Sequence, residues 1–250
     1  FDIDNNSINM DVFKHFLDLL SKKEDGYFKY SYPKYKARMK NIKCRHSDPY
    51  DIELWNLNNM KNIKVIDPIK LGSDESNLWK FRYYDHHFKS NTNQSQIVNE
   101  IVNNYFEGIK WVLLYYFKGC NNWTWQYNFT HGPFISDLFN KFEKRRININ
   151  NIFFDDSKPS EPFTQLLAVL PPQCDKLLPK SYRFLVNDFS SPIIDYYPIS
   201  IDIDLIDHKM HWECIPLIPT VDIFKIRKAT KDLKLTKDEI LFLYLNQVYL

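Results

Sequence analysis

The chain has 250 residues, a mass of 30.2 kDa, 44% hydrophobic residues and a formal net charge of +2. This length allows one large core or two modest ones, because a domain holds roughly 100 to 200 residues. With so small a net charge, any nucleic-acid site must come from local clusters of charge rather than from a global field. Five scattered glycines exclude a glycine-rich phosphate loop, and four distant cysteines support neither a zinc knuckle nor a disulfide scaffold.

The N-terminal part is predicted to be one helix followed by a basic segment. Apolar residues from Met10 to Leu20 recur at helical spacing, which predicts an amphipathic helix over 8–23. Residues 27–75 mix tyrosine, lysine and asparagine with little periodicity, which predicts a long loop or insertion. The first region is therefore residues 1–75, an N-terminal helix plus a basic, tyrosine-rich loop or insertion. Residues 29–45 of this loop are also a candidate protein-interaction platform.

Two further helices are expected before the middle of the chain. Leu78, Phe81 and residues 82–88 fit a short helix, and residues 97–117 fit a long one that ends at Gly119, where a C-cap glycine belongs. The longest uninterrupted apolar run, Trp111–Phe117, is far shorter than the ~20 residues that a membrane helix needs. No membrane partner is expected, although part of this helix could expose apolar surface to another protein segment.

Aromatic residues then occur at every second position. In an extended segment, Trp123, Trp125 and Tyr127 would share one face, as in a base-stacking platform or a core strand. For any single ring, a stacking role and a core role agree about equally well with the sequence. The surrounding asparagines and threonines favour an exposed loop. We therefore predict that Trp123, Trp125, Tyr127 and His131 contact nucleic acid.

The C-terminal part is predicted to hold short helices joined by extended loops, because most of the 13 prolines lie between Pro159 and Pro219. Short strands are expected near Phe153 and between residues 201 and 218. Thr236 with Glu239 forms the pattern of a capping box and predicts a last helix over 237–245. The predicted fold class is mainly α with a few short β strands (α+β).

Two acidic or histidine-containing patterns are candidates for metal binding. Asp202 and Asp204 would share a strand face and could hold a hard cation, but a solvated hairpin is the favoured interpretation. Asp85, His86 and His87 lie on a predicted helix, where adjacent side chains diverge by ~100°, so a polar helix face is favoured. No metal ligand and no catalytic residue is predicted in this chain.

Several segments, in order, resemble the XRN family of 5'-to-3' exoribonucleases. The helix EGIKWVLLYYFKGC precedes WTWQYNFTHGPFISD, and FTQLLAVLPPQCDKLLPKSYRFLVNDFSSPIIDYYP and HWECIPLIP follow. The segment WTWQYNFTHGPFISD departs from the family pattern at Gln126 and over residues 128–132. The resemblance covers residues 78–229 and implies that the chain is the end of the first conserved region plus the second conserved region, which occupies 76–250.

This resemblance implies a part of an enzyme that hydrolyses single-stranded RNA with a 5' monophosphate, processively and one nucleotide at a time. The family uses two divalent cations, Mg²⁺ or Mn²⁺, held by an acidic cluster upstream, and that cluster is not found here. The chain would be a helical body that packs around the catalytic half of the same protein, shapes the substrate channel and stacks the terminal base. Alone it is predicted to be inactive.

The LLAVLP segment and Glu213 after Trp212 resemble the cytoplasmic branch of the family more than the nuclear branch, which predicts a cytoplasmic role in mRNA decay. The alternative to an enzyme part is a non-catalytic RNA-binding or protein-interaction scaffold that keeps this region without the catalytic half.

Overall fold

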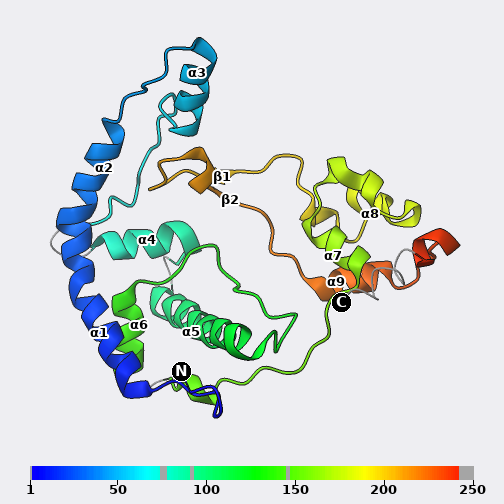
Figure 1. The fold of residues 1–250 in the computed structure, drawn as a ribbon, viewed down its shortest axis with the longest axis horizontal. Helices are drawn as coiled ribbons and strands as arrows, with labels where there is room; N and C mark the ends of the chain where they lie inside the picture. Colours follow the sequence, from blue (N-terminus) through cyan, green and yellow to red (C-terminus); the bar gives the residue numbers. More distant parts are fainter. Residues whose placement is uncertain (1, 74–77, 91–92, 145–146, 242–250) are drawn as a thin grey trace. The chain divides into compact units, whose positions relative to one another are not determined.

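The computed structural model describes residues 2–73, 78–90, 93–144 and 147–241 (Figure 1). These residues are mainly helical, with one two-stranded sheet among them, so the predicted fold class is confirmed. Their contacts divide the chain into two units. The first unit comprises Phe1–Asn121, Gln126–Asp155 and Ile203–Ile215, and the second comprises Asn122–Trp125, Asp156–Asp202 and Pro216–Leu250. The division into conserved regions at residues 75 and 76 stays a prediction.

The elements of the first part of the chain are α1 (Met10–Gly26), the π-helical turn η1 (Tyr27–Ser31), α2 (Tyr32–Lys40), α3 (Pro49–Asn58), α4 (Leu78–Phe88), α5 (Gln94–Lys118), α6 (Ile135–Glu143) and η2 (Ile149–Asn151). The later elements are α7 (Pro162–Val169), η3 (Pro172–Leu177), η4 (Lys180–Tyr182), α8 (Phe184–Asn187), η5 (Ile194–Tyr196), β1 (Ile203–Asp204), η6 (His211–Glu213), β2 (Ile215–Pro216) and α9 (Ile223–Thr230).

Helices α1 and α2 form one continuous rod joined by the π-helical turn (Figure 1). The Asn9 side chain caps the start of the rod by accepting a hydrogen bond from the Val12 amide at 3.0 Å. Pro33, in the first turn of α2, has no amide hydrogen and would clash with the carbonyl four residues earlier in a regular helix. The widened π turn lies where that clash would fall.

The prediction of a long loop over 27–75 is wrong for the residues of η1, α2 and α3. Helix α2 has little amphipathic character because most of its residues are exposed, so the apolar periodicity that marks a packed helix is missing. The start of α3 carried a signal that was overlooked. Asp48 accepts hydrogen bonds from the Tyr50 and Asp51 amides, and Pro49 occupies the first helical turn.

The predicted long helix is confirmed as α5, and its end follows from one glycine. Gly119 has φ +94°, a conformation that a residue with a side chain rarely adopts, so the chain turns away from the helix there. The exposed apolar surface expected near its end is present at Val112, Tyr115, Tyr116 and Phe117. Among the described residues, no helix combines the length and the apolar character needed to cross a membrane.

The core of the first unit lies where α1, α5 and α6 pack side by side (Figure 1). Phe13 of α1 meets Phe106 of α5 and Phe142 of α6 edge to face, with ring centroids 6.5 and 5.4 Å apart. A second cluster joins the π-helical turn of the rod to α4 through Phe28, Trp79 and Phe134, and Trp79 is fully buried. These rings fix α4 against the segment that leads into α6.

The buried Glu24 carboxylate connects α1, α4 and the start of α6. Glu24 of α1 accepts hydrogen bonds from the amides of Ile135 and Ser136, at 2.6 and 3.2 Å, and pairs with Lys80 of α4 at 3.0 Å. Because the residue before α6, Phe134, offers no side-chain cap, Glu24 supplies the acceptor and the negative charge that a helix N-terminus needs.

The second unit has a core of its own. Its fully or nearly buried side chains come from α7, α8, α9 and the turns between them: Phe163, Leu167, Leu178, Tyr182, Leu185, Val186, Ile193, Tyr197 and Ile226. Two buried hydroxyls are satisfied within it, since Tyr197 donates to the Leu167 carbonyl and Ser191 to the Leu185 carbonyl. Short helices joined by proline-containing turns, as predicted, surround this core.

The predicted hairpin between residues 201 and 218 is present as β1 paired with β2, and Asp207 adopts φ +61° in its turn. The strand predicted near Phe153 is wrong. Residues 152–160 have no regular structure, and Phe153 is 86% exposed, so this aromatic residue lies in a surface segment and not in a strand. The capping box is confirmed by reciprocal hydrogen bonds between Thr236 and Glu239, whereas residues 242–245 of the predicted last helix lie outside the described residues.

We predict that Glu24→Gln lowers the free energy of unfolding of the first unit by about 3 kcal/mol, because Lys80 and the α6 amides lose a buried charged partner. Asp18→Asn is the matched control. Asp18 lies on the same helix and pairs with an exposed lysine, Lys22, at 2.6 Å. This control should lose less than about 0.5 kcal/mol. Urea unfolding followed by circular dichroism measures both variants, and equal losses would contradict the proposed importance of Glu24.

Candidate functional site

The four residues predicted to contact nucleic acid lie in the segment between α5 and α6. The segment contains no strand, so the expected alternation on one extended face is not formed. Trp123 and Trp125 belong to the second unit, whereas Tyr127 and His131 belong to the first.

A hydrogen-bonded turn presents Trp123 to solvent. The buried Asn122 side chain accepts hydrogen bonds from the backbone amides of Thr124 and Trp125, at 2.9 and 2.5 Å, and from the Thr124 hydroxyl at 3.2 Å. The Trp123 amide donates to Ser157 Oγ at 2.5 Å. With its backbone held on both sides, the Trp123 side chain remains 51% exposed. This combination of a fixed backbone and an exposed ring suits a stacking contact.

Tyr127 has a structural role in the first unit, and Trp125 is half-buried. The Tyr127 hydroxyl donates to the His131 carbonyl at 2.8 Å, and its ring meets that of Tyr105 edge to face. Burial raises the pKa of the Tyr127 phenol, which therefore stays protonated as a donor. Next to it, the Asn128 amide donates to the Asn104 side chain of α5. These contacts attach the segment to α5.

His131 lies in a cluster with His87 of α4 and Asp204 of β1. The two imidazole rings are stacked with centroids 3.7 Å apart, and His87 Nδ1 and His131 Nε2 each lie 3.3 Å from Asp204 Oδ2. His131 Nδ1 is also 2.9 Å from the Thr130 hydroxyl. Only 12% of the His131 side chain is exposed, so its ring is available to a ligand only through this cluster.

Burial decides the charge of the two histidines. Desolvation, with help from the neighbouring His131, lowers the pKa of His87 to about 4, against the opposing attraction of Asp204. Burial also lowers the pKa of His131. Both rings are therefore neutral at pH 7, and Asp204 faces hydrogen-bond donors rather than cations.

This cluster corrects two interpretations made from the sequence. His87 is not part of a solvated helix face, because only 6% of its side chain is exposed. Asp204 is equally buried, so the hairpin is not a fully solvated one. No local pattern predicts this contact, since His87 and Asp204 come from distant segments that meet only when the hairpin lies against α4.

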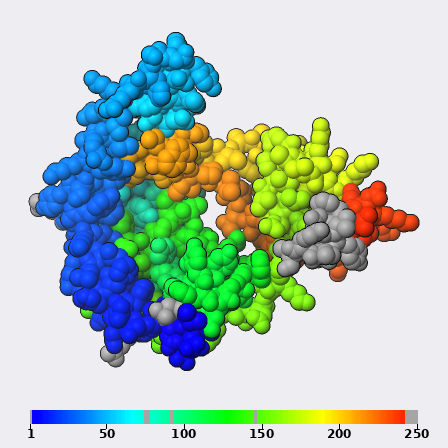
Figure 2. Space-filling model, viewed as in Figure 1, coloured from blue at the N-terminus to red at the C-terminus, as the bar shows by residue number. Residues whose placement is uncertain are grey.

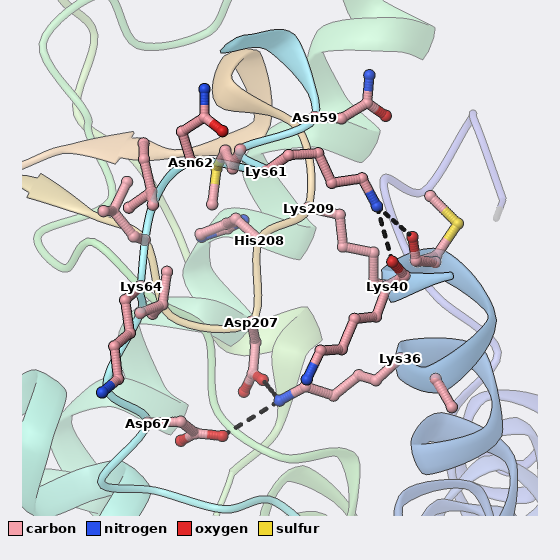
Figure 3. A pocket seen from close by; sticks show the side chains of 16 residues that line it. Lys36, Lys40, Asn59, Lys61, Asn62, Lys64, Asp67, Asp207, His208 and Lys209 are labelled. Carbon is pink, nitrogen blue, oxygen red and sulfur yellow. Dashed lines mark hydrogen bonds and ion pairs between the residues drawn. The ribbon is translucent and has the colours of Figure 1, made fainter. Parts of the chain in front are cut away.

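A second feature of the first unit is a basic pocket of about 640 Å³ between α2, residues 59–65 and the turn of the hairpin (Figure 3). In Figure 2 the light-blue residues of α3 and its surroundings lie close to the orange residues of the hairpin. The lysines that line the pocket are Lys36, Lys40, Lys61, Lys64 and Lys209, and its acidic residues are Asp67 and Asp207.

Contacts within the pocket use some of this charge for structure. Lys36 Nζ lies 3.1 Å from Asp67 and 2.6 Å from Asp207, which ties α2 to both other walls (Figure 3). Lys61 donates to the last carbonyls of α2, at Met39 and Lys40, where the helix dipole favours a cation. Lysines still outnumber aspartates around the pocket, which therefore suits an anionic ligand.

The described residues contain no group of converging carboxylates that fits a pair of Mg²⁺ ions. Three or more ligand atoms come together only at His86, His87 and Asp204 within the searched part of the chain, and two of these residues offer nitrogen. Mg²⁺ requires oxygen ligands in a near-octahedral arrangement. This donor set does not fit the metal chemistry that the resemblance implies, and no catalytic step is assigned to it.

Comparison with known families identifies the fold. The family described as the Xrn1 helical domain matches residues 21–241, which is most of the chain. The chain belongs to this family. Among curated proteins, it is 38% identical over 151 residues to 5'-3' exoribonuclease 1 of Saccharomyces cerevisiae, covering 60% of the chain and 10% of that protein.

Two relatives named 5'-3' exoribonuclease 2 have similar sequence identity to the chain. The chain is 36% identical over 154 residues to 5'-3' exoribonuclease 2 of Gallus gallus, covering 62% of the chain and 16% of that protein. It is 37% identical over 165 residues to 5'-3' exoribonuclease 2 of Candida albicans, covering 64% and 17% respectively. The chain thus spans a small fraction of the length of these relatives.

We predict that Asn122→Ala lowers the free energy of unfolding of the second unit by about 1–2 kcal/mol, because two backbone amides lose their acceptor. Asn128→Ala is the control, since Asn128 is exposed and donates to Asn104 through its backbone amide, which the substitution keeps. Chemical denaturation measures both. A loss for Asn128→Ala as large as for Asn122→Ala would show that the Asn122 turn does not hold this segment.

Proposed function

We propose that this chain is the helical, non-catalytic part of a 5'-3' exoribonuclease that degrades RNA bearing a 5' monophosphate, processively, to mononucleotides. The observation that carries the proposal is the family match over residues 21–241, together with relatives that are named 5'-3' exoribonucleases. In this proposal the chain contributes contacts to the RNA path and surface for the catalytic half, while the hydrolytic groups lie in that other half.

Trp123 is the proposed stacking residue. Its exposed ring and its fixed backbone support a contact with an unpaired base. Stacking on an aromatic ring is worth roughly 1–3 kcal/mol per base and tolerates every base, as an exonuclease that meets all sequences requires. Trp125 is half-buried, and Tyr127 and His131 are engaged in contacts within the first unit, so Trp123 has the strongest case of the predicted set.

The basic pocket is a proposed contact for phosphate. Lys40 and Lys64 line it beside the paired Lys36, and a local excess of positive charge attracts a polyanion even when the net charge of the chain is small. A cytoplasmic role in mRNA decay is also proposed, on the resemblance of the LLAVLP segment to the cytoplasmic branch.

Hydrolysis requires the catalytic half in this proposal. Two-metal hydrolysis needs several carboxylates converging on ions about 3.5–4 Å apart. Two buried or partly buried carboxylates of the first unit have structural partners instead: Glu24 caps α6, and Asp137 accepts a hydrogen bond from the Tyr84 hydroxyl at 2.6 Å.

We predict that the isolated chain releases no mononucleotides from 5'-monophosphorylated single-stranded RNA in Mg²⁺ or Mn²⁺, whereas the full-length protein does. Thin-layer analysis of labelled RNA measures the product, with 5'-hydroxyl RNA as the substrate control. Metal-dependent release by the isolated chain would contradict the division of roles. A full-length protein that binds this RNA without degrading it would favour the scaffold alternative.

We predict that Trp123→Ala weakens binding of short single-stranded RNA by about 1–3 kcal/mol, which is roughly 5- to 150-fold in dissociation constant. Trp212→Ala is the matched control, because Trp212 is an exposed tryptophan outside the aromatic segment. Fluorescence anisotropy of labelled RNA with the full-length protein, at low and physiological salt, measures affinity and its salt dependence. Equal effects of the two substitutions would rule out a specific stacking role for Trp123.

A further inference from the structure

Four of the chain's seven histidines lie near one buried carboxylate in the first unit. His86 and His87 come from α4, His131 precedes α6, and His208 follows the turn of the hairpin. His208 is close enough for its charge to influence the pKa of both His87 and His131. The carboxylate at the centre is that of Asp204, whose side chain is 6% exposed.

The ligand atoms have the spacing of a metal site. One ligand atom from each of His86, His87 and Asp204 lies within 4.8 Å of the other two. His87 Nδ1 and Asp204 Oδ2 are 3.3 Å apart. Two ligands of a tetrahedral Zn²⁺ are about 3.3 Å apart when each metal–ligand bond is about 2.0–2.1 Å. The His87 and Asp204 atoms are therefore already separated by the edge of a zinc tetrahedron.

His86 completes the set in spite of its adjacency to His87. Neighbouring residues on a helix diverge at their Cβ atoms by ~100°, but Asp204 comes from another element and lies within reach of both rings. His86 is exposed, so its ring can turn toward the other two ligands without displacing packed side chains.

The charge of the site also calls for a cation. Asp204 Oδ2 lies 3.3 Å from His87 Nδ1 and 3.3 Å from His131 Nε2. Asp204 Oδ1 accepts a hydrogen bond from the Ile206 amide at 2.8 Å, which satisfies that oxygen and leaves Oδ2 facing the two imidazoles. Burying a carboxylate is costly, and a divalent ion beside Oδ2 would offset that cost.

We propose that His86, His87 and Asp204 form a Zn²⁺ site that joins α4 to the hairpin of the first unit. Two imidazoles and one carboxylate are ligands that zinc prefers, and Mg²⁺, which takes oxygen ligands, is disfavoured. Three protein ligands leave a fourth position for water. His131, stacked on His87, packs on one side of the site. This proposal is independent of the exoribonuclease proposal, because it concerns ligands other than the implied catalytic carboxylates.

Calorimetric titration of ZnCl₂ into the chelator-treated chain tests the site, and absorption of bound Co²⁺ reports whether its geometry is tetrahedral. We expect one equivalent of Zn²⁺ to bind with His86, His87 and Asp204 intact and to raise the melting temperature, because the ion binds the folded state. His87→Ala should weaken binding at least tenfold, and His46→Ala, which removes an exposed histidine outside the cluster, should change it less than twofold.

Asp204→Asn keeps the shape of the side chain and removes its charge, so it tests the site even where His87→Ala disturbs folding. Circular dichroism of each metal-free variant verifies the fold. The proposal is overturned by no measurable Zn²⁺ binding, by binding that His87→Ala and Asp204→Asn both leave unchanged, or by MgCl₂ binding as tightly as ZnCl₂. A tenfold loss in both variants with the fold intact supports it.

Discussion

The Glu24 carboxylate organises the first unit, because three elements depend on a single buried charge. Glu24 belongs to α1. Its carboxylate accepts hydrogen bonds from the first amides of α6 and forms an ion pair with Lys80 of α4. A buried charge is tolerated only when its partners are complete. Loss of any one of these contacts would leave the buried carboxylate incompletely partnered, so the three helices are held in one arrangement. The segment between α5 and α6 is consequently fixed at its α6 end.

The acidic residues of this chain serve structure more than chemistry. Glu24 and Asp137 are engaged by Lys80 and Tyr84, and Asp67 and Asp207 share the ammonium group of Lys36. Carboxylates that are hydrogen-bonded in this way are held apart and cannot converge on a pair of hard cations. This use of acidic groups is consistent with membership of a helical-domain family whose relatives are several times longer than the chain.

The aromatic segment shows how one short stretch of sequence can serve two units. Asn122 and Ser157 hold Trp123 in the second unit, and Tyr127 and His131 pack in the first. The even spacing of the rings predicts that they share one face of an extended segment. In the structure, the position of each ring is set by the side chains that surround it. Exposure therefore separates Trp123 from Tyr127, although both fit the same motif.

The sequence by itself determined the helical class, the long helix ending at Gly119, the hairpin after residue 201 and the family, because these depend on local periodicity, a glycine conformation and the order of motifs. Apolar periodicity did not reveal α2 or α3, since a helix with most faces exposed lacks it, although Asp48 and Pro49 mark the start of α3. Only the tertiary structure brought His87 to Asp204 and Glu24 to α6. Those contacts join residues more than a hundred positions apart, and no local pattern encodes a contact between such distant residues.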